Sequence, residues 1–341
     1  MRTVFMGSPE FAVPCLRALA ARTEVLAVVC QPDKPAGRGL TLHPPAVKVA
    51  AQELGLPVLQ PVSLRPDRSS FHQELLALAP EVVVVVAYGK ILPQVLLDIP
   101  PRGCWNVHAS ILPRYRGAAP IQWALLRGET TTGVTLMQMD AGMDTGPTLM
   151  QRELTIADSD TSGVLFQRLS GLGAELLDQG LGLLAAGALP APCPQDHPRA
   201  TMAPLLDKEH GRVDFHRDAA LVSGQLRGVD PWPGAYTMID NRGAAAPLAT
   251  SVAGTPTPLK LFGASVLAEG AGPPGAVLGV DARGLRVACG RGAVLVAELQ
   301  LPGRKRLPAQ AVWAGLHLPL GTILDRDPAT GEATRNPRLG S

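Results

Sequence analysis

The first half of the chain alternates between continuous apolar runs, which are typical of buried strands, and longer stretches with apolar residues at helical spacing. Strands are predicted at residues 2–8, 24–30, 57–61, 81–89, 103–108 and 133–139, and the continuous apolar run at 81–89 is typical of a strand buried on both faces. Helices are predicted at residues 11–21, 45–55, 70–80 and 160–186. This alternation favours an α/β domain over residues 1–187, built on a doubly wound, mostly parallel, Rossmann-like sheet.

The pattern changes at residues 188–206, where five prolines stand among small residues, a composition typical of a linker. Beyond this segment, short runs separated by glycine-rich turns predict strands at 258–268, 275–281, 284–290 and 292–303. We therefore expect residues 207–324 to form a small, OB-like β-barrel domain. The polar residues 325–341 are predicted to be a disordered tail.

Composition and charge exclude several classes of protein. The 31 basic residues nearly balance the 29 acidic ones, so contacts to a nucleic acid would have to come from local patches. The five cysteines lack C-x-x-C spacing, which argues against a disulfide framework or a zinc site and favours a reducing compartment. No apolar run reaches membrane-spanning length. We expect a cytoplasmic protein that binds neither a metal nor a membrane.

Three polar residues are expected to meet at one edge of the predicted sheet. Asn106 and His108 lie two residues apart on one strand, so their side chains project to the same face. Asp144 follows the next strand in the run MDAGMDTGP, where glycines permit a tight turn back over the sheet. Ligands of open α/β sheets bind beyond the carboxyl ends of the strands, which is where these residues fall.

An amide, an imidazole and a carboxylate together suit the transfer of an acyl group to an amine. Asn106 could hold the oxyanion that forms at the carbonyl, while His108 takes the proton of the amine. Asp144 would orient His108, with Thr135 on the adjoining strand as a supporting hydrogen-bond partner. Ser110 could be proposed as a covalent nucleophile, but no nucleophile elbow surrounds it. Taken singly, each polar residue is more simply explained as a satisfied strand or turn residue, and only their combination favours a function.

Four segments of the chain closely resemble the folate-dependent formyltransferases, in particular those acting on methionyl-tRNA: VVVAYGKILP, NVHASILP, RYRGAAPIQWAL and GVTLMQMDAGMDTG. The resemblance covers nearly the whole chain except the linker, the stretch 242–258 and the tail. It implies a catalytic set of Asn106, His108 and Asp144. It also implies a folate motif of Ser110, Ile111, Leu112 and Pro113, in which Ile111 replaces a leucine. Around it, Val86, Tyr88 and Gly89 are expected to line the pterin pocket.

This resemblance further implies the two substrates. 10-Formyltetrahydrofolate would donate its formyl group to the α-amino group of methionyl initiator tRNA, and we expect a monomer. The loop QPDKPAGRG, with Lys34 and Arg38, has the composition of a mobile surface loop, but the resemblance implies that it enters the acceptor stem. A basic turn in the predicted barrel would contact phosphates through Arg304, Lys305 and Arg306.

Other functions remain compatible with parts of this pattern. Formyltransferases acting on an amino sugar or a purine precursor would share the polar triad without requiring the basic loop or turn. A formyltetrahydrofolate hydrolase would share the core, whereas the related dehydrogenase would need a further aldehyde dehydrogenase domain. A dinucleotide oxidoreductase is weakly supported, because GSPEFA lacks the G-x-G-x-x-G motif. A pure RNA-binding module would leave the triad unexplained and would bind no folate.

Overall fold

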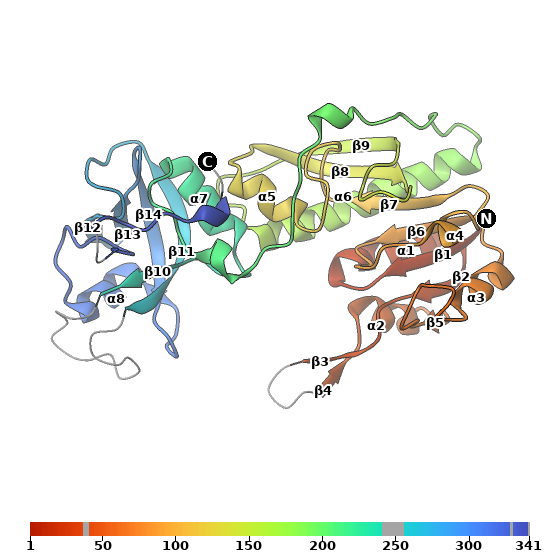
Figure 1. Cartoon of the computed structure of the whole chain (residues 1–341), viewed down its shortest axis with the longest axis horizontal. Helices are drawn as coiled ribbons and strands as arrows, with labels where there is room; N and C mark the ends of the chain where they lie inside the picture. The colour runs from red at the N-terminus through yellow and green to blue at the C-terminus, as the bar shows by residue number, and fades with distance from the viewer. Residues whose placement is uncertain (37–40, 241–255, 328–329, 340–341) are drawn as a thin grey trace. The chain divides into compact units, whose positions relative to one another are not determined.

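A computed structural model describes residues 1–36, 41–240, 256–327 and 330–339 of the chain (Figure 1). Its contacts divide the chain into two compact units. Unit 1 comprises residues 1–120, 131–155 and 166–204. Unit 2 comprises residues 121–130, 156–165 and 205–341, apart from the positions outside the described ranges.

Among the described residues, unit 1 contains a seven-stranded sheet with the order β5-β2-β1-β6-β7-β8-β9. In chain order its strands are β1 (Arg2–Gly7), β2 (Glu24–Val29), β5 (Val58–Leu59), β6 (Val82–Val86), β7 (Cys104–His108), β8 (Thr131–Gln138) and β9 (Thr148–Thr155). The neighbouring strands β5, β2, β1, β6 and β7 pair in parallel. Strand β8 pairs antiparallel with β7, and β9 pairs antiparallel with β8. The predicted α/β fold with a mostly parallel sheet is therefore confirmed.

The composition of β6 explains why this strand lies in the middle of the sheet. All five of its residues are valine and all are buried, as expected for a β-branched strand that is covered on both faces. Its last residue, Val86, pairs with Gly7 of β1. A Cβ on Gly7 would lie 2.8 Å from the carbonyl oxygen of Val86, so only glycine lets the two strand ends come this close.

The helices of unit 1 cover this sheet (Figure 1). They are α1 (Val13–Arg22), α2 (Ala46–Glu53), α3 (Phe71–Leu78), α4 (Gln94–Leu97) and the part of α6 (Ser162–Ala185) from residue 166 onwards, with the short turns η1 (Glu10–Ala12) and η2 (His197–Arg199). Two glycines of α6 leave space for strand side chains, because a Cβ on Gly173 would meet Val107 and one on Gly180 would meet Leu136. The helix thus lies close against β7 and β8, the strands that precede the expected site.

Three strands of unit 1, β9, β3 and β4, were absent from the sequence predictions. Strand β9 lies at the edge of the sheet, where exposed polar residues alternate with partly buried ones and mask its apolar pattern. A hairpin of β3 (Lys34–Ala36) and β4 (Thr41–His43) forms where a loop was expected. The predicted tRNA-contacting Arg38 falls between these strands and lies outside the described residues.

Unit 2 is built around an antiparallel sheet with the order β10-β11-β14-β13-β12, to which β15 adds by pairing with β14. Its strands are β10 (Tyr236–Ile239), β11 (Thr257–Leu267), β12 (Val277–Asp281), β13 (Gly284–Ala288), β14 (Ala293–Gln300) and β15 (Leu307–Pro308). Its helices and short turns are α5 (Pro120–Leu126), α7 (Ala219–Gly228), α8 (Ala309–Leu316), η3 (Lys208–Gly211) and η4 (Pro337–Leu339). The four strands predicted from the sequence correspond to β11 to β14. Most of the stretch 242–258 lies outside the described residues, and β11 begins at its end.

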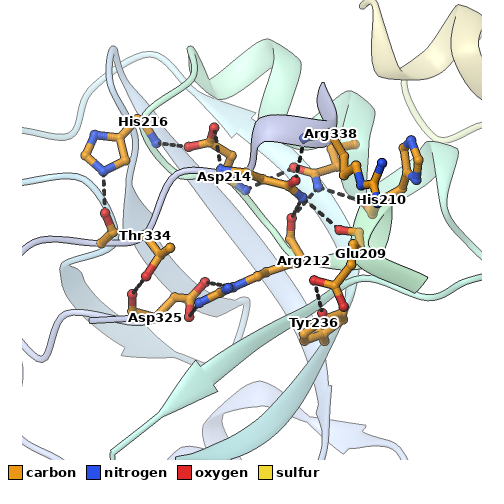
Figure 2. Close-up of polar contacts among 12 residues, drawn as sticks. Glu209, His210, Arg212, Asp214, His216, Tyr236, Asp325, Thr334 and Arg338 are labelled. Atoms are coloured by element: carbon orange, nitrogen blue, oxygen red, sulfur yellow. Dashed lines mark hydrogen bonds and ion pairs between the residues drawn. The ribbon is translucent and has the colours of Figure 1, made fainter. Parts of the chain in front are cut away.

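The described residues of the C-terminal tail pack against the rest of unit 2, in disagreement with the predicted disorder (Figure 2). Asp325 is 2% exposed and forms two hydrogen bonds with the guanidinium of Arg212, at 2.7 and 2.8 Å. The side-chain amide of Asn336 donates to the carbonyl oxygens of Glu209 and Arg212. Leu339 is also buried. Disorder was predicted because the tail is polar overall. The few residues that attach it, such as Asp325 and Asn336, bond to residues more than a hundred positions away in the sequence, and composition does not reveal such contacts.

The predicted linker 188–206 also differs from the structure, because its residues up to 204 belong to unit 1. Cys193 exchanges two backbone hydrogen bonds with Thr148, both of 2.8 Å. Ala203 is fully buried, and its backbone pairs with that of Arg116. The segment thus follows the surface of unit 1 as an added layer. No helix in the described part of the chain is long and apolar enough to cross a membrane.

Candidate active site

Asn106 and His108 lie at the carboxyl end of β7, in the middle of the larger sheet. Asn106 pairs with Val85 of β6, and His108 pairs with Thr135 of β8. Because the side chains of a strand alternate between faces, both polar groups project to the same side. Asp144 approaches that side from the loop between β8 and β9, where it has a left-handed backbone with φ of 54°.

The three side chains meet at the carboxylate of Asp144. One carboxylate oxygen, Oδ1, accepts a hydrogen bond of 3.4 Å from Nδ2 of Asn106. The other, Oδ2, lies 3.6 Å from Nδ1 of His108 and accepts the backbone N–H of Gly117 at 2.8 Å. His108 is 6% exposed, and Asn106 is half-buried. Sequence position and strand register together therefore bring the predicted triad to one place.

The ring of His108 is fixed by a different partner from the one predicted. Its Nε2 lies 2.9 Å from the carbonyl oxygen of Tyr115. Since a carbonyl only accepts hydrogen bonds, the proton must sit on Nε2 in the neutral ring, and Nδ1 carries the free lone pair. Tyr115 thus sets the orientation of the imidazole, while Asp144 faces the nitrogen that can take up a proton.

The loop that carries Asp144 is held by a residue that sequence reasoning missed. Gln195, 7% exposed, donates hydrogen bonds from Nε2 to the carbonyl oxygens of Asp144 and Gly146. Its Oε1 accepts from the guanidinium of Arg116. Gln195 lies among the prolines of the predicted linker. A single glutamine in a segment with the composition of a linker does not by itself indicate a functional residue.

The folate motif expected at residues 110–113 forms a loop whose polar groups bond mainly within the protein. The hydroxyl of Ser110, which is fully buried, donates to the carbonyl oxygen of Arg114 at 2.6 Å. Thr135 donates to the carbonyl oxygen of Ser110 and accepts from the backbone of Leu112. Ser110 and Leu112 therefore fix the loop, which leaves the half-buried Ile111 and Pro113 to offer surface. The supporting role expected of Thr135 agrees with these contacts.

The segment that follows β6 presents backbone rather than side chains. Tyr88 is 2% exposed and packs in the core with Val4, Met6, Val29 and Leu92, and burial raises the pKa of its phenol to about 12. Its carbonyl oxygen accepts a hydrogen bond from Gln31. On either side, Ala87 and Gly89 are exposed and have positive φ values of 47° and 77°. Ile91, 77% exposed, adds an apolar surface next to them. The side chain of Tyr88 thus does not line the surface on which it was expected.

The base of the hairpin β3–β4 is tied to the sheet by a polar network. Lys48 donates to both carboxylate oxygens of Asp33 and to Gln60. Hydrogen bonds from Gln60 and Lys48 lower the pKa of Asp33, in that order of importance. Lys34, the exposed basic residue of the hairpin, donates to Oε1 of Gln31.

In unit 2, the basic turn divides into two kinds of residue. All three residues, Arg304, Lys305 and Arg306, are exposed. The guanidinium of Arg306 also pairs with Glu298, at 2.6 Å through Nε, and lies over the ring of Phe262 at 4.2 Å from its centre. Within the described ranges, no group of three or more His, Cys, Asp or Glu side chains is arranged to hold a metal ion.

Known proteins resemble this chain along almost its entire length. "Methionyl-tRNA formyltransferase" of Geobacter sulfurreducens is 50% identical over 325 residues, which cover 95% of this chain and 96% of that protein. "Methionyl-tRNA formyltransferase" of Citrifermentans bemidjiense is 49% identical, covering 97% and 98% of the two chains.

Solved structures share the fold at much lower sequence identity. An N-formyltransferase from Helicobacter canadensis, solved with folinic acid and dTDP-3-aminofucose, gives a TM-score of 0.62 at 16% identity, over 86% of this chain and 97% of that one. HypX from Aquifex aeolicus, solved with tetrahydrofolic acid, gives 0.56 at 19% identity, over 93% of this chain and 47% of that longer protein.

Two family descriptions match the sequence directly. "Formyl transferase" matches residues 1–181, and "Formyl transferase, C-terminal domain" matches residues 205–317. Because these matches together cover most of the sequence, the chain belongs to the formyl transferase family.

Proposed function

We propose that this protein transfers the formyl group of 10-formyltetrahydrofolate to the α-amino group of methionyl initiator tRNA. The observation that carries the chemistry is the meeting of Asn106 and His108 with the carboxylate of Asp144. The acceptor is supported by the relatives named methionyl-tRNA formyltransferase, which are about half identical to this chain over nearly their whole length.

In this reaction the amine nitrogen bonds to the formyl carbon, and the bond from that carbon to the folate nitrogen breaks. The formyl oxygen becomes an oxyanion on the way. The Nδ2 group of Asn106 has two N–H bonds, and only one is directed at Asp144. The second can donate to the developing oxyanion, a contribution typically worth ~3 kcal/mol of transition-state stabilisation.

His108 handles the proton that leaves the amine. With Nε2 bonded to Tyr115, the lone pair on Nδ1 accepts this proton, and the resulting imidazolium lies 3.6 Å from the carboxylate of Asp144. The same nitrogen can return a proton to the departing folate nitrogen, so the proton count balances without a covalent nucleophile. The buried, internally bonded hydroxyl of Ser110 fits this scheme, because it leaves no free nucleophile on that residue.

The surface beside Asn106 fits a planar, polar-edged ring such as a pterin. Ala87 and Gly89, which are exposed, lie two and four residues after Val85, the strand partner of Asn106, and Ile91 supplies an apolar surface. We propose that residues 86–89 and the loop 110–113 contact the folate mainly through main chain and through Ile111 and Pro113.

For the tRNA, we propose contacts from Lys34 and Arg38 in unit 1 and from the basic turn 304–306 in unit 2. Phosphate contacts of this kind give affinity, and an arginine can also read a base edge. In this scheme residues 1–187 carry the chemistry and 207–324 bind RNA. We further propose a cytoplasmic monomer, since the tRNA would engage both units of one chain.

The test is to incubate the purified protein with 10-formyltetrahydrofolate and methionine-charged initiator tRNA, and to measure formylmethionine by mass spectrometry. We expect product with initiator tRNA, little with elongator methionyl-tRNA, and none detectable with Asn106→Ala. Product from dTDP-3-aminofucose but not from methionyl-tRNA would move the acceptor to an amino sugar. Absence of product from either acceptor would refute the proposed formylation of methionyl-tRNA.

A further inference from the structure

Gln195 uses its whole hydrogen-bonding capacity to connect two loops of the site. Its Oε1 accepts from Nε and Nη2 of Arg116, at 3.1 and 2.7 Å. Its Nε2 donates to the carbonyl oxygens of Asp144, at 2.9 Å, and Gly146, at 2.7 Å. A carboxamide has two donors and two acceptor sites, and all four are satisfied here.

The chemistry of the partners fixes which way the amide points. A guanidinium only donates hydrogen bonds and a carbonyl only accepts them. A flipped amide would therefore place its N–H groups against the N–H groups of Arg116, and its oxygen against the carbonyl oxygens of Asp144 and Gly146. For the same reason a glutamate at this position could pair with Arg116 but could not donate to Asp144 or Gly146. The site therefore requires a side chain that accepts on one side and donates on the other.

The loop that receives these bonds needs external support. Asp144 has a φ of 54°, a left-handed conformation that a non-glycine residue adopts at a cost. Two residues later, a Cβ on Gly146 would collide with the carbonyl oxygen of Gln138. Gln195 binds the carbonyl groups of Asp144 and Gly146 directly, and so stabilises the strained part of the turn.

Arg116 anchors this arrangement from the other side. It is 6% exposed, and its guanidinium contacts Gln195 and Nδ1 of His197. Among the described residues, no carboxylate lies within ion-pair distance of it. The adjacent residue, Gly117, donates its backbone N–H to Oδ2 of Asp144. The segment 116–117 thus holds Asp144 twice, once directly and once through Gln195.

We infer that Gln195, held by Arg116, is a positioning residue that keeps the carboxylate of Asp144 against Asn106 and His108. The proline-rich segment 188–206 then completes the active site instead of merely connecting two domains. This inference rests on the proposed function for its effect on the reaction, but the support that Gln195 gives to the loop can be measured without any substrate.

The kinetic test compares Gln195→Ala and Gln195→Glu with wild type, using Asp196→Ala as a control at the exposed neighbouring position. We expect Gln195→Ala to lower kcat by about 10- to 100-fold, because the carboxylate of Asp144 is no longer held in position. KM for both substrates should stay within about threefold of wild type, because Gln195 is not expected to contact either substrate. The kcat of Gln195→Glu should fall by a similar factor, and the kcat of Asp196→Ala should stay within about twofold of wild type. Wild-type kcat in Gln195→Glu would mean that residue 195 need only accept hydrogen bonds from Arg116, and the inference would be wrong.

A second measurement is independent of activity. Amide hydrogen exchange in residues 139–147 should be faster in Gln195→Ala than in wild type and in Asp196→Ala. Unchanged exchange in this loop would overturn the inference whatever the acceptor proves to be. If the wild type forms no formylmethionyl-tRNA, the proposed function fails and this measurement alone decides the role of Gln195.

Removing Gln195 also leaves the buried charge of Arg116 with fewer partners, which could unfold the chain. The double variant Arg116→Met/Gln195→Met removes the charge together with its partner. We expect it to melt within a few degrees of wild type while keeping the loss of kcat seen in Gln195→Ala. A folded double variant with wild-type kcat would contradict the positioning role.

Discussion

Asp144 accepts hydrogen bonds on both carboxylate oxygens, from Asn106 on Oδ1 and from the backbone N–H of Gly117, 2.8 Å away, on Oδ2. Both partners are donors, so this geometry suits the ionised carboxylate and leaves no favourable place for an amide in its position. The same oxygen, Oδ2, faces Nδ1 of His108. The backbone of Gly117 thus selects which oxygen is presented to the imidazole.

We therefore expect Asp144→Asn to be severely impaired, although it is nearly isosteric. Its amide would place an N–H group against either Gly117 or Asn106, and it could not balance a charged His108. The expected fall in kcat is about 10²- to 10⁴-fold, the range for loss of general acid–base assistance. Steady-state formylation assays measure this, with Glu153→Gln on the exposed edge strand β9 as the control. A kcat within threefold of wild type would remove Asp144 from the mechanism.

The second prediction concerns the ion pair that attaches the tail. Asp325 is 2% exposed, and the side chain of Arg212 is 31% exposed. Asp325→Ala should destabilise unit 2 by about 3 kcal/mol, the lower end of the range for buried pairs because Arg212 partly reaches solvent. Urea denaturation followed by circular dichroism measures this. The double variant Arg212→Met/Asp325→Leu should recover most of the loss, and equal stability of Asp325→Ala and wild type would contradict the role of the pair.

Most of the fold could be predicted because its strongest signals are local. The five valines of Val82–Val86 indicate a strand covered on both faces without any knowledge of their neighbours. Strand β9 escaped prediction because an edge strand exposes alternate polar residues. The tail escaped because Asn336 makes its contacts with Glu209 and Arg212, and composition reports nothing about contacts at that separation.

The site shows the same division between local and distant signals. Asn106 and His108 could be placed on one face because a strand has a period of two residues. Tyr115 could not be identified as the partner of His108, because a backbone carbonyl leaves no trace in residue type. The buried, inward side chain of Tyr88 also differs from expectation, since a tyrosine beside a glycine reads equally well as a core residue or a pocket residue.

The basic turn provides a third prediction, in which its residues should behave differently. All three basic residues are exposed, but Arg306 in addition pairs with Glu298 and stacks on Phe262. Replacing Arg304 and Lys305 by alanine should raise KM for methionyl-tRNA several-fold and reduce its dependence on salt, with KM for the folate unchanged. Arg306→Ala should also lower the stability of unit 2. Assays at 50 and 200 mM salt test this, and an unchanged KM for the tRNA in the double variant would exclude the turn from the interface.

The fourth prediction concerns the thiols. Burial raises the pKa of Cys15, Cys104 and Cys289 to about 12 and that of Cys30 to about 11, whereas Cys193 is exposed. Because the thiolate is the reactive form, iodoacetamide at about pH 8 should label Cys193 alone in the native protein and all the cysteines after denaturation. Peptide mass spectrometry identifies the labelled sites. Rapid native labelling at Cys15 would show that its part of the core opens readily.

The same buried thiols predict a loss of stability at alkaline pH. Their native pKa values of about 11 to 12 lie above the unfolded value of 9.0, so the native state binds more protons between these values. Stability is therefore fully present below about pH 9 and declines as the pH rises towards 12. Urea midpoints measured from pH 8 to 10.5 should fall with pH in wild type and fall less steeply in Cys15→Ala/Cys104→Ala. Parallel slopes in the two proteins would mean that other groups, such as the phenol of Tyr88, carry the alkaline transition.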